Sequence, residues 1–165
     1  MNFSQTDIRI LRELRNNARI SNKVLAARVN IPPSTCLARV HRLVNGGVIS
    51  GFYAEFNPKE IGVGVQAMIL IRMAMHDREA IDRFRSHIQS HDEVVSFYLV
   101  SGQDDFMMHV AVRDVEHLRE FILQALTERP EVDHLETRLM FEESRNPGFP
   151  VYKGAALDKD EPAEG

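Results

Sequence analysis

The sequence predicts an α+β protein: a three-helix helix-turn-helix domain over residues 1–50 and a ferredoxin-like βαββαβ domain over residues 65–144. Apolar residues recur at helical spacing in the first fifty positions, whereas strand and helix periods alternate after residue 65. Residues 1–50 contain eight Lys/Arg and two Asp/Glu, so their net charge is 8 − 2 = +6. The whole chain contains 20 Lys/Arg and 24 Asp/Glu, so the net charge of the remaining residues is 12 − 22 = −10. A basic end on an acidic body favours one domain that faces a polyanion, although an uneven solvated surface would give the same charges.

The composition excludes several classes of protein. With 165 residues, 44% hydrophobic and 27% charged, the chain is long enough for one or two compact cores and too apolar for general disorder. Its single cysteine, Cys36, rules out an intrachain disulfide and a cysteine-based metal cluster. The longest apolar stretch, Ile61–Ile71, is shorter than the ~20 residues of a membrane helix, and residues 1–19 lack the apolar core of a signal peptide. We therefore expect a cytoplasmic protein with no membrane partner.

Two short helices are predicted first. Ser4 and Asp7 fit a capping box, in which each side chain hydrogen-bonds the other residue's backbone N–H at the start of a helix. The apolar positions that follow at helical spacing are Ile8, Leu11 and Leu14. Ser21 suits the N-cap of a second helix over Asn22–Val29. Asn30 follows where a left-handed residue would end that helix, because asparagine tolerates this backbone conformation.

A third helix is predicted from Pro33 to about Asn45. Proline suits the first helical position, since its φ is already helical and its missing N–H would be unpaired there. When the positions are sorted by the 3.6-residue period, the apolar side consists of Cys36, Leu37, Val40, Leu43 and Val44. The opposite side is small, hydroxylated and basic, and consists of Thr35, Ala38, Arg39 and Arg42, with Ser34 at its N-terminal edge.

This opposite side has the chemistry of a helix that reads the major groove of double-stranded DNA. Small residues allow close approach to base edges, arginine hydrogen-bonds guanine or phosphate, and serine and threonine hydrogen-bond either. No carboxylate lies between Ser34 and Asn45, whereas an ordinary amphipathic surface helix, the alternative, mixes Glu with Lys. The predicted DNA contacts, led by the two arginines, are Ser34, Thr35, Ala38, Arg39 and Arg42.

Five runs in this domain carry a resemblance to a known family. They are Asp7–Leu14, Ala18–Ser21, Leu25–Ala26, Pro33–Val40 and Gly47–Ile49. Together they resemble the N-terminal domain of the Lrp/AsnC regulators, the leucine-responsive or feast/famine transcription factors. The sequence departs from the family pattern at Asn30, where glycine is common, at Pro32, where a capping serine is usual, and at Val44, where glutamate is common. The missing serine cap would cost ~1 kcal/mol of helix stability. None of the three departures lies on the side of the third helix that is predicted to contact DNA.

The segment after the third helix is predicted to be a strand-like linker over residues 51–64. Val48–Phe56 is rich in aromatic and β-branched residues before Asn57 and Pro58 interrupt it. In the resembled family this segment helps to pair two protomers, and the resemblance implies the same here.

From residue 65 the hydrophobic period changes in the order βαββαβ. The expected elements are a strand at Val65–Met75, a helix at Arg78–Gln89, a strand at Glu93–Val100, a turn at Ser101–Asp105, a strand at Phe106–Val112, a helix marked by Val115, Leu118, Ile122, Ala125 and Leu126, and a strand at Val132–Glu142. This order is that of the ferredoxin-like fold, which leaves one face of its sheet without helices. A second copy of the chain is the simplest cover for such a face, so we expect a homo-oligomer. The resemblance implies dimers and higher rings such as an octamer. Residues 145–165, which end in a small and acidic stretch, are expected to form a disordered tail.

A candidate effector site lies in the second domain. The turn residues Ser101, Gly102, Asp104 and Asp105 match the family's Gly-x-x-Asp turn, and Thr137 matches a recurrent threonine on the last strand. The resemblance implies that these residues bind a small molecule, expected to be an amino acid, where subunits meet. The chemistry fits, because a glycine turn exposes N–H donors for a carboxylate, and an aspartate attracts an ammonium group. The alternative is an ordinary β-turn, for which glycine and aspartate are the usual residues.

Catalysis is not expected. The seven histidines are dispersed, the sequence has no glycine-rich phosphate loop or nucleophile elbow, and Cys36 falls on the apolar side of its helix. We expect no cofactor and no metal, only an amino-acid effector. The favoured function is a transcriptional regulator that binds DNA, oligomerises and senses a small molecule. Two alternatives stay open: an architectural protein that wraps DNA with little sequence preference, and a small-molecule-binding domain with a vestigial helix-turn-helix.

Overall fold

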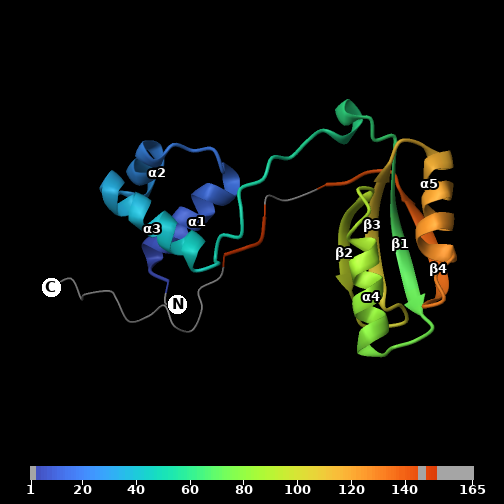
Figure 1. Ribbon diagram of the computed structural model, residues 1–165. Coiled ribbons are helices and arrows are strands. Elements are labelled where there is room, and N and C mark those ends of the chain that lie inside the picture. The colour runs from blue at the N-terminus through green and yellow to red at the C-terminus, as the bar shows by residue number, and fades with distance from the viewer. Residues whose placement is uncertain (1–2, 145–147, 152–165) are drawn as a thin grey trace. The chain divides into compact units, whose positions relative to one another are not determined.

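The computed structural model describes residues 3–144 and 148–151 (Figure 1). These residues fall into two compact units, the first with residues 3–55 and 148–151 and the second with residues 56–144. Most of the tail expected over residues 145–165 lies outside the described residues. In the described part of the chain, no helix is long and apolar enough to cross a bilayer.

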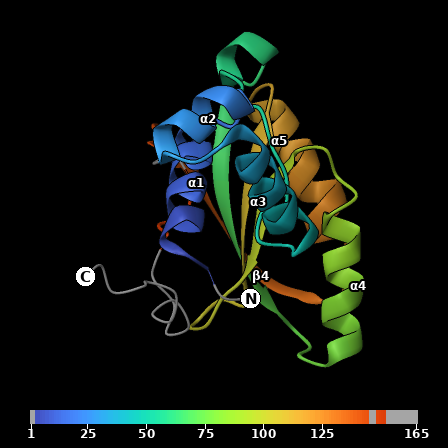
Figure 2. The same ribbon diagram turned by 90° about the vertical axis from the view of Figure 1, so that its left-hand side faces the viewer.

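The first unit contains three helices, α1 (Gln5–Asn16), α2 (Asn22–Val29) and α3 (Pro33–Asn45) (Figure 2). Both hydrogen bonds of the Ser4–Asp7 capping box are present, so the predicted start of α1 is confirmed. Helix α2 ends at Asn30, which adopts the left-handed conformation with φ of 57°. The predicted bounds of α2 and α3 are likewise confirmed, and the N-cap of α3, Pro32, makes no side-chain capping hydrogen bond.

A small apolar core joins these helices. Its buried members are Ile10, Leu25, Ala26, Val29, Cys36 and Leu43. Each large side chain buried here stabilises the fold by about 1.5–3 kcal/mol. The buried side of α3 centres on Cys36, Val40 and Leu43, whereas Leu37 and Val44 are 45% and 38% exposed. The prediction that placed Leu37 and Val44 on the packed side was therefore wrong, because the helix packs with a slightly different rotation.

The segment after α3 differs from the predicted strand. Residues 50–57 form no strand, and the only regular element between residues 51 and 64 is the short 3₁₀ helix η1 (Pro58–Ile61). A strand needs a neighbour to satisfy its backbone hydrogen bonds, and in a single chain this segment has none. Its aromatic residues Phe52, Tyr53 and Phe56 are more than half exposed.

The second unit has the predicted βαββαβ order. Its strands are β1 (Val65–Met73), β2 (Val94–Leu99), β3 (Phe106–Val112) and β4 (Val132–Met140). The helices are α4 (Arg78–Ile88) and α5 (Val115–Ile122), and α5 continues into a π-helical turn, η2 (Leu123–Thr127). The strand order is β2-β3-β1-β4 and every pairing is antiparallel, which confirms the ferredoxin-like fold. Strand β1 ends two residues earlier than predicted because the chain bends after Met73 towards α4.

Both helices of this unit cover the same face of the sheet (Figure 2). The covered face is the core, where alternate β1 residues, Ala67, Ile69, Ile71 and Met73, are buried. They pack with Phe84 and Ile88 of α4, Leu118 and Phe121 of α5, and Phe106, Met108 and Val110 of β3. The intervening residues Met68 and Leu70 point to the other face and are only half-buried. Among the described residues of the second unit, therefore, no helix covers the other face of the sheet.

Candidate DNA interface and effector turn

A buried carboxylate joins helices α1 and α3. Asp7 has no exposed surface, and its Oδ2 accepts hydrogen bonds from the backbone N–H and hydroxyl of Ser4, each at 2.9 Å. From α3, Arg39 donates to Oδ1 at 3.0 Å and Arg42 donates to Oδ2 at 2.6 Å. Arg39 also donates to the Ser4 hydroxyl at 2.9 Å. One carboxylate thus holds two arginines of α3 against the start of α1.

These hydrogen bonds keep Asp7 ionised. Burial by itself raises the pKa of Asp7, because it penalises the charged form. The Ser4 backbone N–H, the Arg39 hydrogen bond, the Ser4 hydroxyl and the positive charge of Arg42 together outweigh this effect, so the pKa lies below its ordinary value. The negative charge is therefore part of the folded structure at neutral pH.

The two arginines keep groups free for a ligand. Each uses one terminal nitrogen towards Asp7, and the side chains of Arg39 and Arg42 remain 31% and 48% exposed. A guanidinium carries five N–H donors, so further hydrogen bonds from each are available. One carboxylate against two guanidinium groups leaves the cluster with one net positive charge.

The outward side of α3 includes two residues that were not among the predicted DNA contacts. Ser34, Thr35 and Ala38 are exposed as expected, and His41 and Asn45 are exposed on the same side of the helix. The helical period places positions 34, 38, 41 and 45 opposite the buried Cys36 and Leu43. His41 and Asn45 were missed because the apolar side was assigned with the wrong rotation. The Asp7 partner was missed because it lies on a different helix.

The turn between α2 and α3 is also held by side chains. Asn22 donates from its amide nitrogen to the Pro33 carbonyl at 2.8 Å, which ties the start of α2 to the start of α3. Arg9 of α1 donates to the Arg28 carbonyl at 3.1 Å, and Arg28 pairs with Glu13 at 2.7 Å. The first contact thus ties α2 to α3, and the other two tie α1 to α2.

The effector turn predicted over residues 101–105 lies at one end of the sheet. Asp105 is half-buried, and its Oδ2 accepts the backbone N–H of Met73 at 2.7 Å. His76 also lies 3.1 Å from both carboxylate oxygens of Asp105. Gly102 has φ of 131°, which a residue with a side chain rarely adopts. Asp105 therefore fastens the turn to the end of β1 as well as offering a carboxylate.

The remaining predicted effector residues do not all lie at this end of the sheet. Ser101 and Gly102 are exposed, and Asp104 is half-buried. Thr137 lies on β4 opposite Ile69, on the other side of β1 from the turn, and is exposed. The turn leads into β3 and Thr137 lies on β4, so β1 separates them in the sheet.

Comparison with known proteins identifies both units. Residues 3–50 match a winged helix-turn-helix DNA-binding domain, and residues 66–147 match the Lrp/AsnC ligand binding domain. The transcriptional regulator AldR of Mycolicibacterium smegmatis is 44% identical over 139 residues, covering 84% of this chain and 81% of AldR. The chain belongs to the Lrp/AsnC family of transcriptional regulators.

Other Lrp/AsnC proteins agree with this assignment. The leucine-responsive regulatory protein of Haemophilus influenzae is 33% identical and covers 89% of both chains. Among solved structures, the Neisseria meningitidis regulator NMB0573 in complex with L-Met has a TM-score of 0.83 at 26% identity, covering 88% of this chain and 94% of its own. The M. tuberculosis AldR structure has a TM-score of 0.73 at 37% identity, covering 90% and 100%.

The family fixes the general function. This Lrp/AsnC protein is a DNA-binding transcriptional regulator with a ligand-binding domain, and it is not an enzyme, since its relatives are named as regulators. This bears out the predicted family, fold class and regulatory role.

Proposed function

We propose that α3 enters the major groove of double-stranded DNA and that the second unit oligomerises and senses an amino acid. The Asp7 cluster is the observation that carries the first part. It presents two arginines from one side of α3 with a net positive charge and leaves the outward residues of the helix exposed. Small exposed residues allow a helix to enter the major groove, and arginines beside them can bind the phosphates that flank the groove.

Within this proposal the contacts divide into two kinds. Ser34, Thr35, Ala38 and His41 lie on the outward side and approach base edges, where an imidazole can donate or accept a hydrogen bond. Arg39 and Arg42 are anchored at one nitrogen, and their remaining N–H groups bind phosphate or a guanine edge.

The direct test is binding of the protein to its own upstream DNA against a scrambled control, over a salt series, with and without each of the twenty amino acids. Selective, salt-sensitive binding that one amino acid alters would support the whole proposal. Equal binding to both DNAs would favour an architectural protein instead. No binding even at low salt would mean that the helix-turn-helix is vestigial.

Substitutions in α3 separate the two kinds of contact. If Arg42 binds phosphate rather than a guanine edge, Arg42→Ala should weaken binding to all sequences alike and lower the salt slope by about one. Removing a base contact by His41→Ala should change the preferred base at one position of the site and leave the salt slope unchanged. If His41→Ala retains the wild-type base preferences in a selection from randomised DNA, His41 is not a base contact.

The proposed effector site is the turn of residues 101–105 together with Thr137. A related structure holds L-Met, which supports an amino acid as the class of ligand. The exposed N–H groups near Gly102 suit a carboxylate, and Asp104 or Asp105 suits an ammonium group. Asp105→Ala, checked for normal assembly, should abolish amino-acid binding in calorimetry, and unchanged binding would contradict this assignment.

The proposed assembly uses the sheet face that no helix covers. Leu70 and Met107 are cross-strand partners on this face, and Tyr98 of β2 pairs with Met107 and is 50% exposed. Apolar residues in the middle of an open sheet are stabilised when a second sheet covers them. We propose that a second copy of the chain packs here and that dimers are the unit from which a ring such as an octamer is built.

A further inference from the structure

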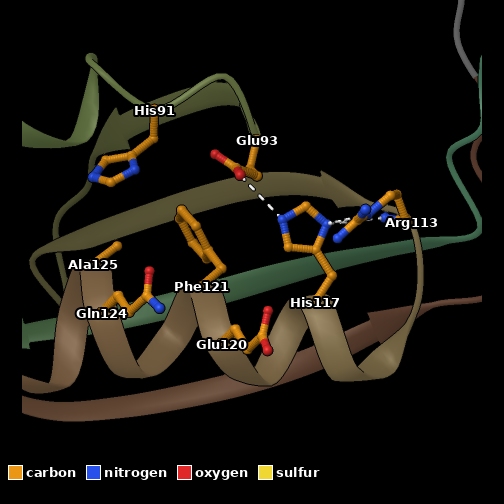
Figure 3. Close-up of a pocket in the computed structure, with 8 residues that line it drawn as sticks. All are labelled: His91, Glu93, Arg113, His117, Glu120, Phe121, Gln124 and Ala125. Carbon is orange, nitrogen blue, oxygen red and sulfur yellow. Dashed lines mark hydrogen bonds and ion pairs between the residues drawn. The ribbon is translucent and has the colours of Figure 1, made fainter.

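A polar cavity lies within the second unit, and its lining shares no residue with the effector turn or with α3. It has a volume of about 130 Å³, well above the ~10–15 Å³ that one water molecule requires. It lies between α5 with η2 on one side and the connection from α4 to β2 on the other (Figure 3). The lining residues are His91, Glu93, Arg113, His117, Glu120, Phe121, Gln124 and Ala125.

The contacts of His117 fix the orientation of its ring at one end of the cavity. Its Nδ1 faces two donors from Arg113, the backbone N–H and Nε–H, each at 3.4 Å, so Nδ1 accepts. Its Nε2 lies 3.1 Å from Oε1 of Glu93 and must carry the proton that it donates there. The imidazole of His117 therefore bridges Arg113 and the carboxylate of Glu93 at one end of the cavity.

The charges around the cavity favour a cation. Glu93 lies on the strand side and Glu120 on the helix side, with the ring of Phe121 between them (Figure 3). Arg113 supplies the single positive charge and stands at the end next to His117. The two carboxylates against one guanidinium give these three side chains a net charge of −1.

We propose that this cavity binds the primary ammonium group of a small molecule between Glu93 and Glu120. Two carboxylates accept charge-assisted hydrogen bonds from an ammonium, and an aromatic ring at the site adds a cation–π attraction. The ammonium can belong to a short aliphatic amine or to an α-amino acid, whose carboxylate would then meet Arg113. None of these residues belongs to the effector turn or to α3, so the inference does not depend on the proposed DNA binding.

The test is calorimetric titration of the full chain with three probes of similar size: n-propylammonium, L-alanine and propionate. We expect n-propylammonium to bind and propionate not to bind. Glu120→Gln keeps the shape of the side chain and removes its charge, so it should raise the Kd of n-propylammonium about tenfold or more. Glu128→Gln, which changes an exposed glutamate outside the cavity, is the matched control and should leave the Kd unchanged.

Arg113→Gln distinguishes the two sources of the ammonium. If the ligand is an amino acid, this substitution should weaken the binding of L-alanine and leave the binding of n-propylammonium unchanged. If the ligand is a simple amine, the two probes should bind with equal affinity both to the wild type and to the variant. L-alanine binding that is lost in Asp105→Ala but insensitive to Glu120→Gln belongs to the effector turn. The proposal is overturned if Glu120→Gln, folded as judged by its thermal melt, leaves n-propylammonium binding unchanged, or if propionate binds more tightly than the amine.

Discussion

At the scale of single residues, Asp7 determines how the first unit holds together. Its carboxylate accepts from Ser4, Arg39 and Arg42 while fully buried, and removing one partner of a buried ionic network is costly. We expect Asp7→Asn to lower the free energy of unfolding by about 3 kcal/mol, measured by urea denaturation. Glu13→Gln, which breaks an exposed pair with Arg28, should cost less than about 1 kcal/mol, and equal effects of the two substitutions would contradict the central role of Asp7.

The same residue predicts an acid-sensitive first unit. The pKa of Asp7 is lower in the folded protein than its ordinary value, so its ionisation stabilises the fold above the unfolded pKa of about 4. This stabilisation is lost as the pH falls from about 4 through the lower folded pKa. Urea denaturation between pH 5 and 2 should show a steeper loss of stability for the wild type than for Asp7→Asn. Parallel curves for the two proteins would show that Asp7 is not the titrating group.

At the scale of elements, side-chain caps set where helices begin. Asp77 accepts the Ala80 N–H at 2.8 Å at the start of α4, which satisfies a donor that the helix itself cannot. We expect Asp77→Ala to lower the free energy of unfolding by about 1 kcal/mol, measured by thermal or urea denaturation of the second unit. Asp92→Ala, at an exposed position before β2, is the control and should change stability by less than about 0.5 kcal/mol.

The elements that the sequence predicted well are those with local signals. The capping box at Ser4, the left-handed Asn30 and Pro33 at a helix start each depend on a few neighbouring residues, and all three are as predicted. The prediction of a strand-like segment over Val48–Phe56 was wrong. The composition of a segment reports only its preference for extended structure, whereas a strand also requires a neighbouring strand with which to hydrogen-bond. The rotation of α3 was wrong for a related reason, since Leu37 and Val44 are apolar but the neighbouring helices pack against Cys36 and Leu43 instead.

The candidate sites were predictable only in part. Ser34, Thr35 and Ala38 are exposed on α3 as the period indicates, but the carboxylate that holds Arg39 and Arg42 lies more than thirty positions away in the sequence. No pattern within α3 reports such a partner. The sequence could not predict the cavity beside His117, because its lining comes from α5, η2 and two loops that only the fold brings together.

At the scale of the whole molecule, the proposed dimer joins two DNA-binding units. A dimer that engages two half-sites gains affinity because the second contact is intramolecular, and a chain that cannot pair loses this gain. Leu70 and Met107 face each other on the uncovered side of the sheet, so Leu70→Lys places a charge where a second copy is proposed to pack. We expect this variant to sediment as a monomer and to bind a two-half-site operator at least 100-fold more weakly, with binding to a single half-site unchanged.

The control for this prediction is Val115→Lys on α5, which places the same charge at a position that is 62% exposed and outside the uncovered face. It should leave both sedimentation and operator binding unchanged. If Leu70→Lys still forms the wild-type oligomer while its thermal melt is unaltered, the uncovered face is not the dimer interface. If the variant loses the oligomer but keeps full affinity for the operator, each DNA-binding domain binds DNA independently of the others. Effector-driven changes in assembly could then not control DNA binding.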